Sequence, residues 1–151
     1  MMPVAISPAQ IKEIAGELDA GMKCFYHIPT GEVKSYPDEF RGHAGFEEEF
    51  WEDVMEQVES APEEFVAFEA LESSESFSMM ETFINNIEEV KIQRQFQDAI
   101  RLRKPFQQFK YLLYDYPVLR EQWFDFKNHY LMEHVEQQLK SYNSLKNPEN
   151  D

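Results

Sequence analysis

The residues best suited to metal or nucleophilic chemistry in this sequence are four histidines and one cysteine. His129 and His134 lie five positions apart in a segment with helical periodicity. They are therefore rotated about 140° from each other around the helix axis and do not share a metal ion. His27 and His43 have no cysteine or carboxylate pair at the spacing of a zinc site. The sequence thus predicts no metal site.

Cys24 lies in a short segment whose alternating pattern predicts a strand. A catalytic thiol needs a base and an electropositive setting, but His27 is three positions away and would point to the opposite face of the strand. We therefore predict a packed, unreactive thiol. Because the chain has a single cysteine, it forms no internal disulfide, which agrees with a reducing compartment.

The glycine and serine motifs of common enzymes are missing. The chain has five glycines, and none of them forms a phosphate-binding loop or a nucleophile elbow. We predict no catalytic residue, no cofactor and no enzymatic activity. An enzyme with an unrecognised pocket between sheet and helices is a third class of function, after the two binding functions considered below.

Charge is divided unevenly along the chain, whose formal charge is −15 at pH 7. Residues 1–90 carry 21 acidic and four basic side chains, whereas residues 91–151 carry eight acidic and ten basic ones. This balance disfavours binding of duplex DNA over the whole surface and docking to an anionic membrane. A local anion-binding patch in the second part is compatible with it.

The acidic side chains are densest in segment 46–61, which predicts an amphipathic helix. Its carboxylates fan out along one face and do not converge as a hard cation requires. A solvated face is one interpretation, and a surface for a basic partner or a mimic of a phosphate backbone is another. The acidic candidates for an interaction surface are Glu48, Glu52 and Glu56.

The most distinctive segment combines aromatic and basic residues, with nine aromatic residues between positions 106 and 130. Basic residues beside exposed aromatic rings can stack single-stranded bases. Helical spacing instead favours a core position for most of these rings, with the cations facing the acidic helix or solvent. The sequence does not assign Phe106, Phe109, Trp123 and Phe126 to core or surface. The basic candidates for an interaction surface are Arg101, Arg103, Lys104, Lys110 and Lys127.

The elements that position these residues predict an α+β fold in a single globular domain, residues 1–151. Ser7, Pro8 and Gln10 have the types and spacing of a helix start, and Gly21 ends that helix. Residues 23–36 predict a β-hairpin and residues 65–71 a third strand. The fold is therefore an N-terminal helix, a small antiparallel β-sheet (hairpin plus third strand) and a helix-rich C-terminal part. Its last helix runs from about residue 118 to 142, and a frayed tail follows from about residue 143.

Targeting and membrane signals are missing from the sequence. The first residues carry no basic segment, and no window approaches the ~18 apolar residues of a transmembrane helix. We predict a cytoplasmic protein that does not bind membranes.

Several segments together resemble one known family. They are LDAGM at 18–22, TGEV at 30–33, SFSMMETFI at 76–84, KPFQQFK at 104–110 and REQWFDF at 120–126. This pattern is similar to the uncharacterised bacterial protein family 0158 of the UPF series, over roughly residues 11–139. The resemblance implies a small soluble bacterial protein in one domain. Because members of that family have no assigned activity, it assigns no catalytic or binding residue.

The sequence thus favours a non-catalytic, cytosolic protein-interaction module with an unidentified protein partner. The alternative is a protein that associates with single-stranded nucleic acid through the basic and aromatic region 91–127. The oligomeric state does not follow from the sequence.

Overall fold

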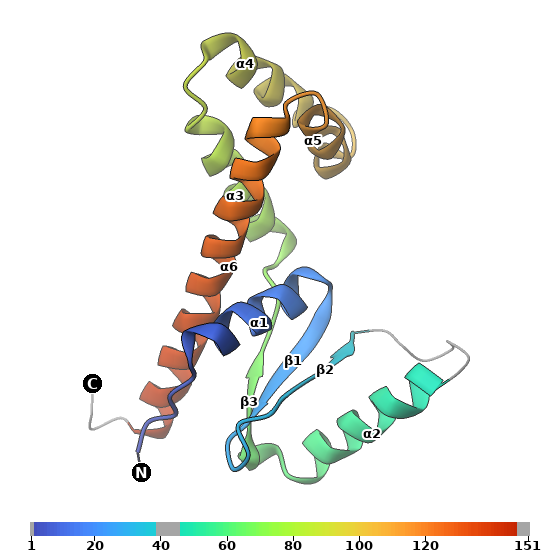
Figure 1. The fold of residues 1–151 in the computed structure, drawn as a ribbon, viewed down its shortest axis with the longest axis vertical. Helices are drawn as coiled ribbons and strands as arrows, with labels where there is room; N and C mark the ends of the chain where they lie inside the picture. Colours follow the sequence, from blue (N-terminus) through green and yellow to red (C-terminus); the bar gives the residue numbers. More distant parts are fainter. Residues whose placement is uncertain (1, 39–45, 148–151) are drawn as a thin grey trace. The chain divides into compact units, whose positions relative to one another are not determined.

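The computed structural model describes residues 2–38 and 46–147, and its contacts divide the chain into two compact units (Figure 1). Unit 1 contains the residues up to Ala70 and those from Leu131 onward, and unit 2 is Leu71–Tyr130. The last helix, α6 (Pro117–Lys146), contributes to both units. That the two units form a single folding domain stays a prediction.

Unit 1 begins with α1 (Pro8–Asp19), which starts as predicted. The Ser7 hydroxyl accepts a hydrogen bond from the backbone N–H of Gln10 at 3.2 Å, and Pro8 occupies the first turn, where no N–H is needed. The helix is followed by Gly21, whose φ of +84° suits a residue without a Cβ. The chain can therefore turn directly from α1 into the sheet.

The sheet confirms the predicted hairpin and third strand. Its strands are β1 (Met22–His27), β2 (Val33–Pro37) and β3 (Phe65–Phe68), all antiparallel in the order β2-β1-β3. β3 ends before the predicted residue 71. At that point the backbone N–H of Glu69 donates to the side chain of Gln138 on α6 and no longer to a strand. A side chain distant in sequence thus sets the end of β3.

Each face of the sheet is covered by a helix, because side chains alternate along a strand. The hydroxyl of Ser35 on β2 donates to Glu17 of α1 at 3.0 Å, on the sheet face that also contains Cys24. On the other face, Phe25 packs in one buried cluster with Val54 of α2 (Phe46–Ser60). The 3₁₀ turn η1 (Pro62–Glu64) joins α2 to β3.

Unit 2 is built from α3 (Ser73–Asn85), α4 (Val90–Ala99), α5 (Pro105–Leu113) and the first part of α6. Its core is aromatic: the ring of Trp123 lies 4.8 Å from that of Phe109 and 5.3 Å from that of Phe83. Phe126 is partly buried against this core, whereas Phe106 is 41% exposed. The structure therefore places three of the four undecided aromatic residues in or against the core.

Two helix ends differ from what the sequence indicates. Ser73 and Ser74 are of a residue type that commonly caps helices, but α3 starts at Ser73 with Glu72 as its N-cap, so neither serine caps it. α6 continues to Lys146, four residues past the predicted end, because the side chain of Asn143 makes two hydrogen bonds to the backbone of Val4. The helix therefore extends past residue 143, where we expected a frayed tail to begin, and residues 148–151 lie outside the described part of the chain.

The helices found by the structure, together with the three strands, confirm the α+β class. Within the described ranges, no helix combines the length and the apolar character needed to cross a membrane.

Candidate interaction site

The predicted acidic candidates lie on α2 in unit 1. Glu52 and Glu56 are exposed on the outer side of the helix, away from the sheet. Glu48 is partly buried, and it already makes an interaction of its own. The acidic surface is therefore carried by Glu52 and Glu56 more than by Glu48.

The predicted basic candidates all lie in unit 2. Arg101, Arg103 and Lys104 are exposed in the connection between α4 and α5, and Lys110 is exposed on α5. Lys127 is partly buried on α6. The acidic and basic candidates thus belong to different compact units.

Lys127 is part of a stack of alternating aromatic rings and cations. The guanidinium carbon of Arg120 lies 4.8 Å from the ring centre of Tyr114 and 5.4 Å from that of Phe124. The Lys127 Nζ lies 5.2 Å from the ring centre of Phe124. We call Tyr114, Arg120, Phe124 and Lys127 the aromatic–cation ladder. Each such contact contributes about 0.5–1 kcal/mol at an exposed site.

Helical geometry explains how these residues meet. Arg120, Phe124 and Lys127 have the spacing i, i+4, i+7, which places them on one side of α6. Tyr114 is the C-cap residue of α5, just before α6 begins. The buried ring of Trp123, whose centre is 6.0 Å from the Lys127 Nζ, anchors this side of α6 in the core. The candidate surface predicted from the sequence includes Lys127 but not Arg120 or Phe124, although their helical spacing indicates that the three lie together.

Two ladder residues, Tyr114 and Phe124, are among the exposed large hydrophobic side chains of unit 2. Among the described residues, ten large hydrophobic side chains are exposed, and seven of these lie in unit 2. Tyr114 is 65% exposed and Phe124 42%. The seven are Val90, Leu102, Phe106, Tyr111, Tyr114, Val118 and Phe124.

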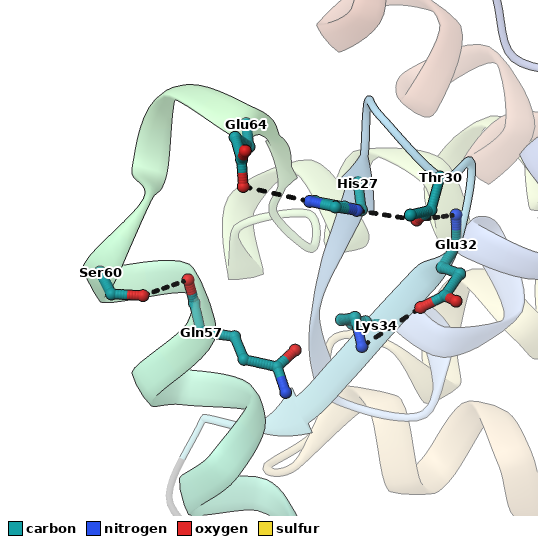
Figure 2. A network of polar contacts seen from close by, with 7 residues as sticks. All are labelled: His27, Thr30, Glu32, Lys34, Gln57, Ser60 and Glu64. Atoms are coloured by element: carbon teal, nitrogen blue, oxygen red, sulfur yellow. Dashed lines mark hydrogen bonds and ion pairs between the residues drawn. The ribbon is translucent and has the colours of Figure 1, made fainter.

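A second feature, in unit 1, is a polar pocket of about 330 Å³ between the C-terminal end of α2 and the β-hairpin. Figure 2 shows His27, one of the residues that line it, between Glu64 and Thr30. The His27 Nδ1 lies 2.7 Å from the hydroxyl of Thr30, and its Nε2 lies 3.3 Å from a carboxylate oxygen of Glu64. On β2, the Lys34 Nζ lies 3.3 Å from a carboxylate oxygen of Glu32.

The contact between His27 and Glu64 joins residues that are 37 positions apart, so local spacing does not reveal it. It arises because β1 pairs with β3 so that His27 lies opposite Phe65. In the ranges that the structure describes, no three or more histidine, cysteine or carboxylate side chains converge as a metal site requires. The side chains that meet at this pocket are joined by hydrogen bonds and an ion pair.

The sequence model of the uncharacterised protein family UPF0158 matches residues 44–147. The chain belongs to this family. The UPF0158 protein PA5073 of Pseudomonas aeruginosa is 32% identical over 76 residues, which are 50% of this chain and 50% of the relative. The chain thus spans about half the length of the curated relative that it matches. No solved structure matches the chain.

The UPF0158 match covers the two candidate features, the ladder and the pocket, to different extents. All four ladder residues lie inside the matched range, as do all the acidic and basic candidates. The pocket lies only partly inside it, because Glu64 is within the match but His27 and Thr30 precede it. The ladder is therefore the feature that the family match covers completely.

The remaining candidate residues make structural contacts. Cys24 is fully buried as a free thiol, and its burial, together with the charges of Glu17 and Glu13 on α1, raises its pKa to about 12. This confirms the packed thiol. On α6, His129 and His134 contact two different backbone carbonyls, those of Asp125 and Glu69. His43 lies outside the described residues.

Proposed function

We propose that this UPF0158 chain is a non-catalytic protein-interaction module whose contact face is the aromatic–cation ladder of unit 2. The observation that carries the proposal is an arginine stacked against two exposed aromatic rings. Tyrosine, phenylalanine and arginine are enriched in protein interfaces, and tyrosine and arginine are also enriched among the residues that dominate binding energy. The stacking holds these side chains in place before a partner arrives, which lowers the entropic cost of binding.

The chemistry of the ladder also indicates the partner. Arg120 and Lys127 each place a cation against a ring, and Lys110 is exposed on the neighbouring helix. A partner surface that presents an apolar side chain with carboxylates around it would complement both components. We therefore propose an acidic protein partner for the ladder.

Affinity capture with quantitative mass spectrometry tests this proposal. The tagged chain is compared with Arg120→Ala, Phe124→Ala and the control Arg94→Ala, which removes an exposed arginine of α4 in the same unit. We expect a stoichiometric partner to be retained by the wild type and by the control and lost by both ladder variants. A partner set that is unchanged in Arg120→Ala and Phe124→Ala would contradict the ladder as contact face.

The acidic side of α2 is a separate version of the interaction proposal, directed at a basic partner. Exposure of Glu52 and Glu56 supports it. The triple variant Glu48→Lys, Glu52→Lys and Glu56→Lys reverses the charge of this surface. Loss of a partner in this variant alone, with the ladder variants unaffected, would assign binding to α2.

Association with single-stranded nucleic acid is the second candidate function, and the same ladder favours it. Exposed rings next to cations can stack bases and contact phosphates. Fluorescence anisotropy with a labelled single-stranded oligonucleotide at low salt tests it, with Lys104→Glu and Lys110→Glu as weakened variants. Absence of any anisotropy change for the wild-type chain at low salt would eliminate this function.

The proposed location is the bacterial cytoplasm. A relative from Pseudomonas aeruginosa supports the bacterial origin. The buried, unpaired Cys24 is compatible with a reducing compartment. Fractionation of the source cells, followed by immunoblotting of the cytoplasmic, membrane and periplasmic fractions, tests the compartment.

A further inference from the structure

The polar pocket around His27 gathers side chains from four separate elements of unit 1. His27 ends β1, Lys34 lies on β2, Gln57 lies near the end of α2, and Glu64 ends η1. A backbone hydrogen bond joins two of these elements: the N–H of Ile28, next to β1, donates to the carbonyl of Glu64 at 2.8 Å. This bond holds His27 and Glu64 close together.

The hairpin turn that closes one side of the pocket is equally well defined. The N–H of Gly31 donates to the carbonyl of His27 at 2.7 Å, and the N–H of His27 donates to the carbonyl of Glu32 at 2.8 Å. The Thr30 hydroxyl accepts from the N–H of Glu32 at 3.3 Å and lies against the imidazole of His27. His27 is thus held by Thr30 on one ring nitrogen and by Glu64 on the other.

The charges that face the pocket sum to a negative value. Lys34 compensates Glu32, at 3.3 Å, which leaves the carboxylate of Glu64 opposite an imidazole that is uncharged unless protonated. The C-terminal end of α2 also lines the pocket through Gln57, Ser60 and Ala61, and no basic residue lies in its last turn. The helix dipole therefore adds partial negative charge at the same place.

Hydrogen-bond acceptors are available to a ligand in this pocket. In Figure 2 the side-chain amide of Gln57 extends from α2 toward the sheet, and within the described part of the chain it has no hydrogen-bond partner. The hydrogen bond with His27 uses one carboxylate oxygen of Glu64, and the side chain of Glu64 is 46% exposed. The free amide and the second carboxylate oxygen can both receive N–H donors.

We propose that this pocket binds an organic cation, either a guanidinium or a primary ammonium group. A guanidinium offers several N–H donors in one plane, which suits a carboxylate and an amide oxygen on adjacent elements. The volume of about 330 Å³ lies at the lower end of small-molecule sites, so the ligand is a small molecule or a single side chain of a peptide. The site does not depend on the ladder and would stand if the proposed function failed.

A titration of the ¹⁵N-labelled chain with L-argininamide, followed by two-dimensional NMR, tests the proposal. We expect saturable shifts of the backbone amides at residues 27–34 and 57–65. Glu64→Gln should weaken the apparent affinity at least about tenfold, because a charge-assisted hydrogen bond is lost. The control Glu63→Gln makes the same charge change at the adjacent exposed residue, which does not line the pocket. The apparent affinity of this control for L-argininamide should stay within about twofold of the wild-type value.

A chain with a charge of −15 attracts cations everywhere, so the location of the shifts decides the outcome. Shifts that are confined to the backbone amides around Glu52 and Glu56 on α2, or shifts that persist unchanged in Glu64→Gln, would overturn the proposal. No saturable shift would also overturn it. If Glu64→Gln loses the native spectrum, Gln57→Ala replaces it, because Gln57 has no side-chain bond to the hairpin. Unchanged affinity in Gln57→Ala then counts as refutation.

Discussion

Cys24 shows that the surroundings of a residue decide its chemistry more than its type does. The thiol is fully buried between the sheet and α1, and two glutamates of α1 lie close enough to oppose its ionisation. The sequence pattern was sufficient to predict a packed thiol, because alternation along β1 separates Cys24 from His27. It could not predict the contribution of Glu13 and Glu17, which depends on how α1 crosses the sheet.

The pKa of Cys24 predicts a pH dependence of stability. Folding raises the pKa from 9.0 to about 12, so above pH 9 the unfolded chain releases a proton that the native chain keeps. This contribution is complete below pH 9 and is lost as the pH rises toward 12. The raised pKa of Tyr36, caused first by burial, acts in the same direction.

Between pH 8 and pH 10, the unfolding free energy of the wild type should fall by roughly 1 kcal/mol more than that of Cys24→Ala. Urea denaturation at both pH values measures this difference, and the wild type and the variant share all other titrating groups. Parallel losses in the two proteins would show that the thiol is not protected by the fold.

Lys104 is the residue at which backbone strain and a predicted interaction surface coincide. Its φ of 58° lies in the left-handed region, which no other non-glycine residue in the described ranges adopts, and it precedes Pro105. We expect Lys104→Gly to stabilise the chain by up to about 1 kcal/mol, because a glycine has no Cβ to strain.

The matched control for this prediction is Lys110→Gly, the same substitution inside α5. It should destabilise the chain by about 1 kcal/mol, because glycine disfavours a helix interior. Urea denaturation compares both variants with wild type. Destabilisation by both substitutions would mean that the left-handed conformation at residue 104 carries no strain.

At the scale of elements, the sequence predicts starts of helices better than ends of elements. The start of α1 is set by Ser7 and Pro8, which act within one turn and are visible in the sequence. The ends of β3 and α6 are set by Gln138 and Asn143, which bond to backbone groups 69 and 139 positions away. Such partners cannot be identified before the fold is known.

The same reasoning yields a prediction for the end of α6. Asn143 bonds both the N–H and the carbonyl of Val4, at 2.8 and 3.0 Å. Asn143→Ala should lower the unfolding free energy by about 1–2 kcal/mol and increase hydrogen exchange of the amides at residues 143–146. Ser141→Ala, at an exposed position of the same helix, should change neither quantity. Equal exchange in the two variants would show that the helix end does not need Val4.

At the scale of the whole molecule, the net charge concealed the more informative division. Counting charges separately in residues 1–90 and 91–151 shows that most acidic side chains belong to the first range and most basic side chains to the second. The sequence identified the region that contains the ladder, and it selected candidate cations because many basic residues occur there. It did not reveal the pairing of Arg120 with Tyr114 and Phe124. The contact of His27 with Glu64 was beyond prediction, because it requires the pairing of β1 with β3.

The division into two units raises the question of whether they unfold together, as the single-domain prediction requires. The continuous helix α6 supplies a physical reason for coupling. If unit 2 unfolded alone, α6 would have to begin near Leu131, where newly exposed N–H groups would lack partners just beside the buried Leu131 and Val135. We therefore expect one cooperative transition.

The two tryptophans report on it separately, because Trp51 lies on α2 in unit 1 and Trp123 lies in the core of unit 2. Urea curves of the single-tryptophan variants Trp51→Phe and Trp123→Phe should each match circular dichroism of the same variant in midpoint and slope. A tryptophan signal that separates from the circular dichroism curve in either variant would show that the two units are independent domains.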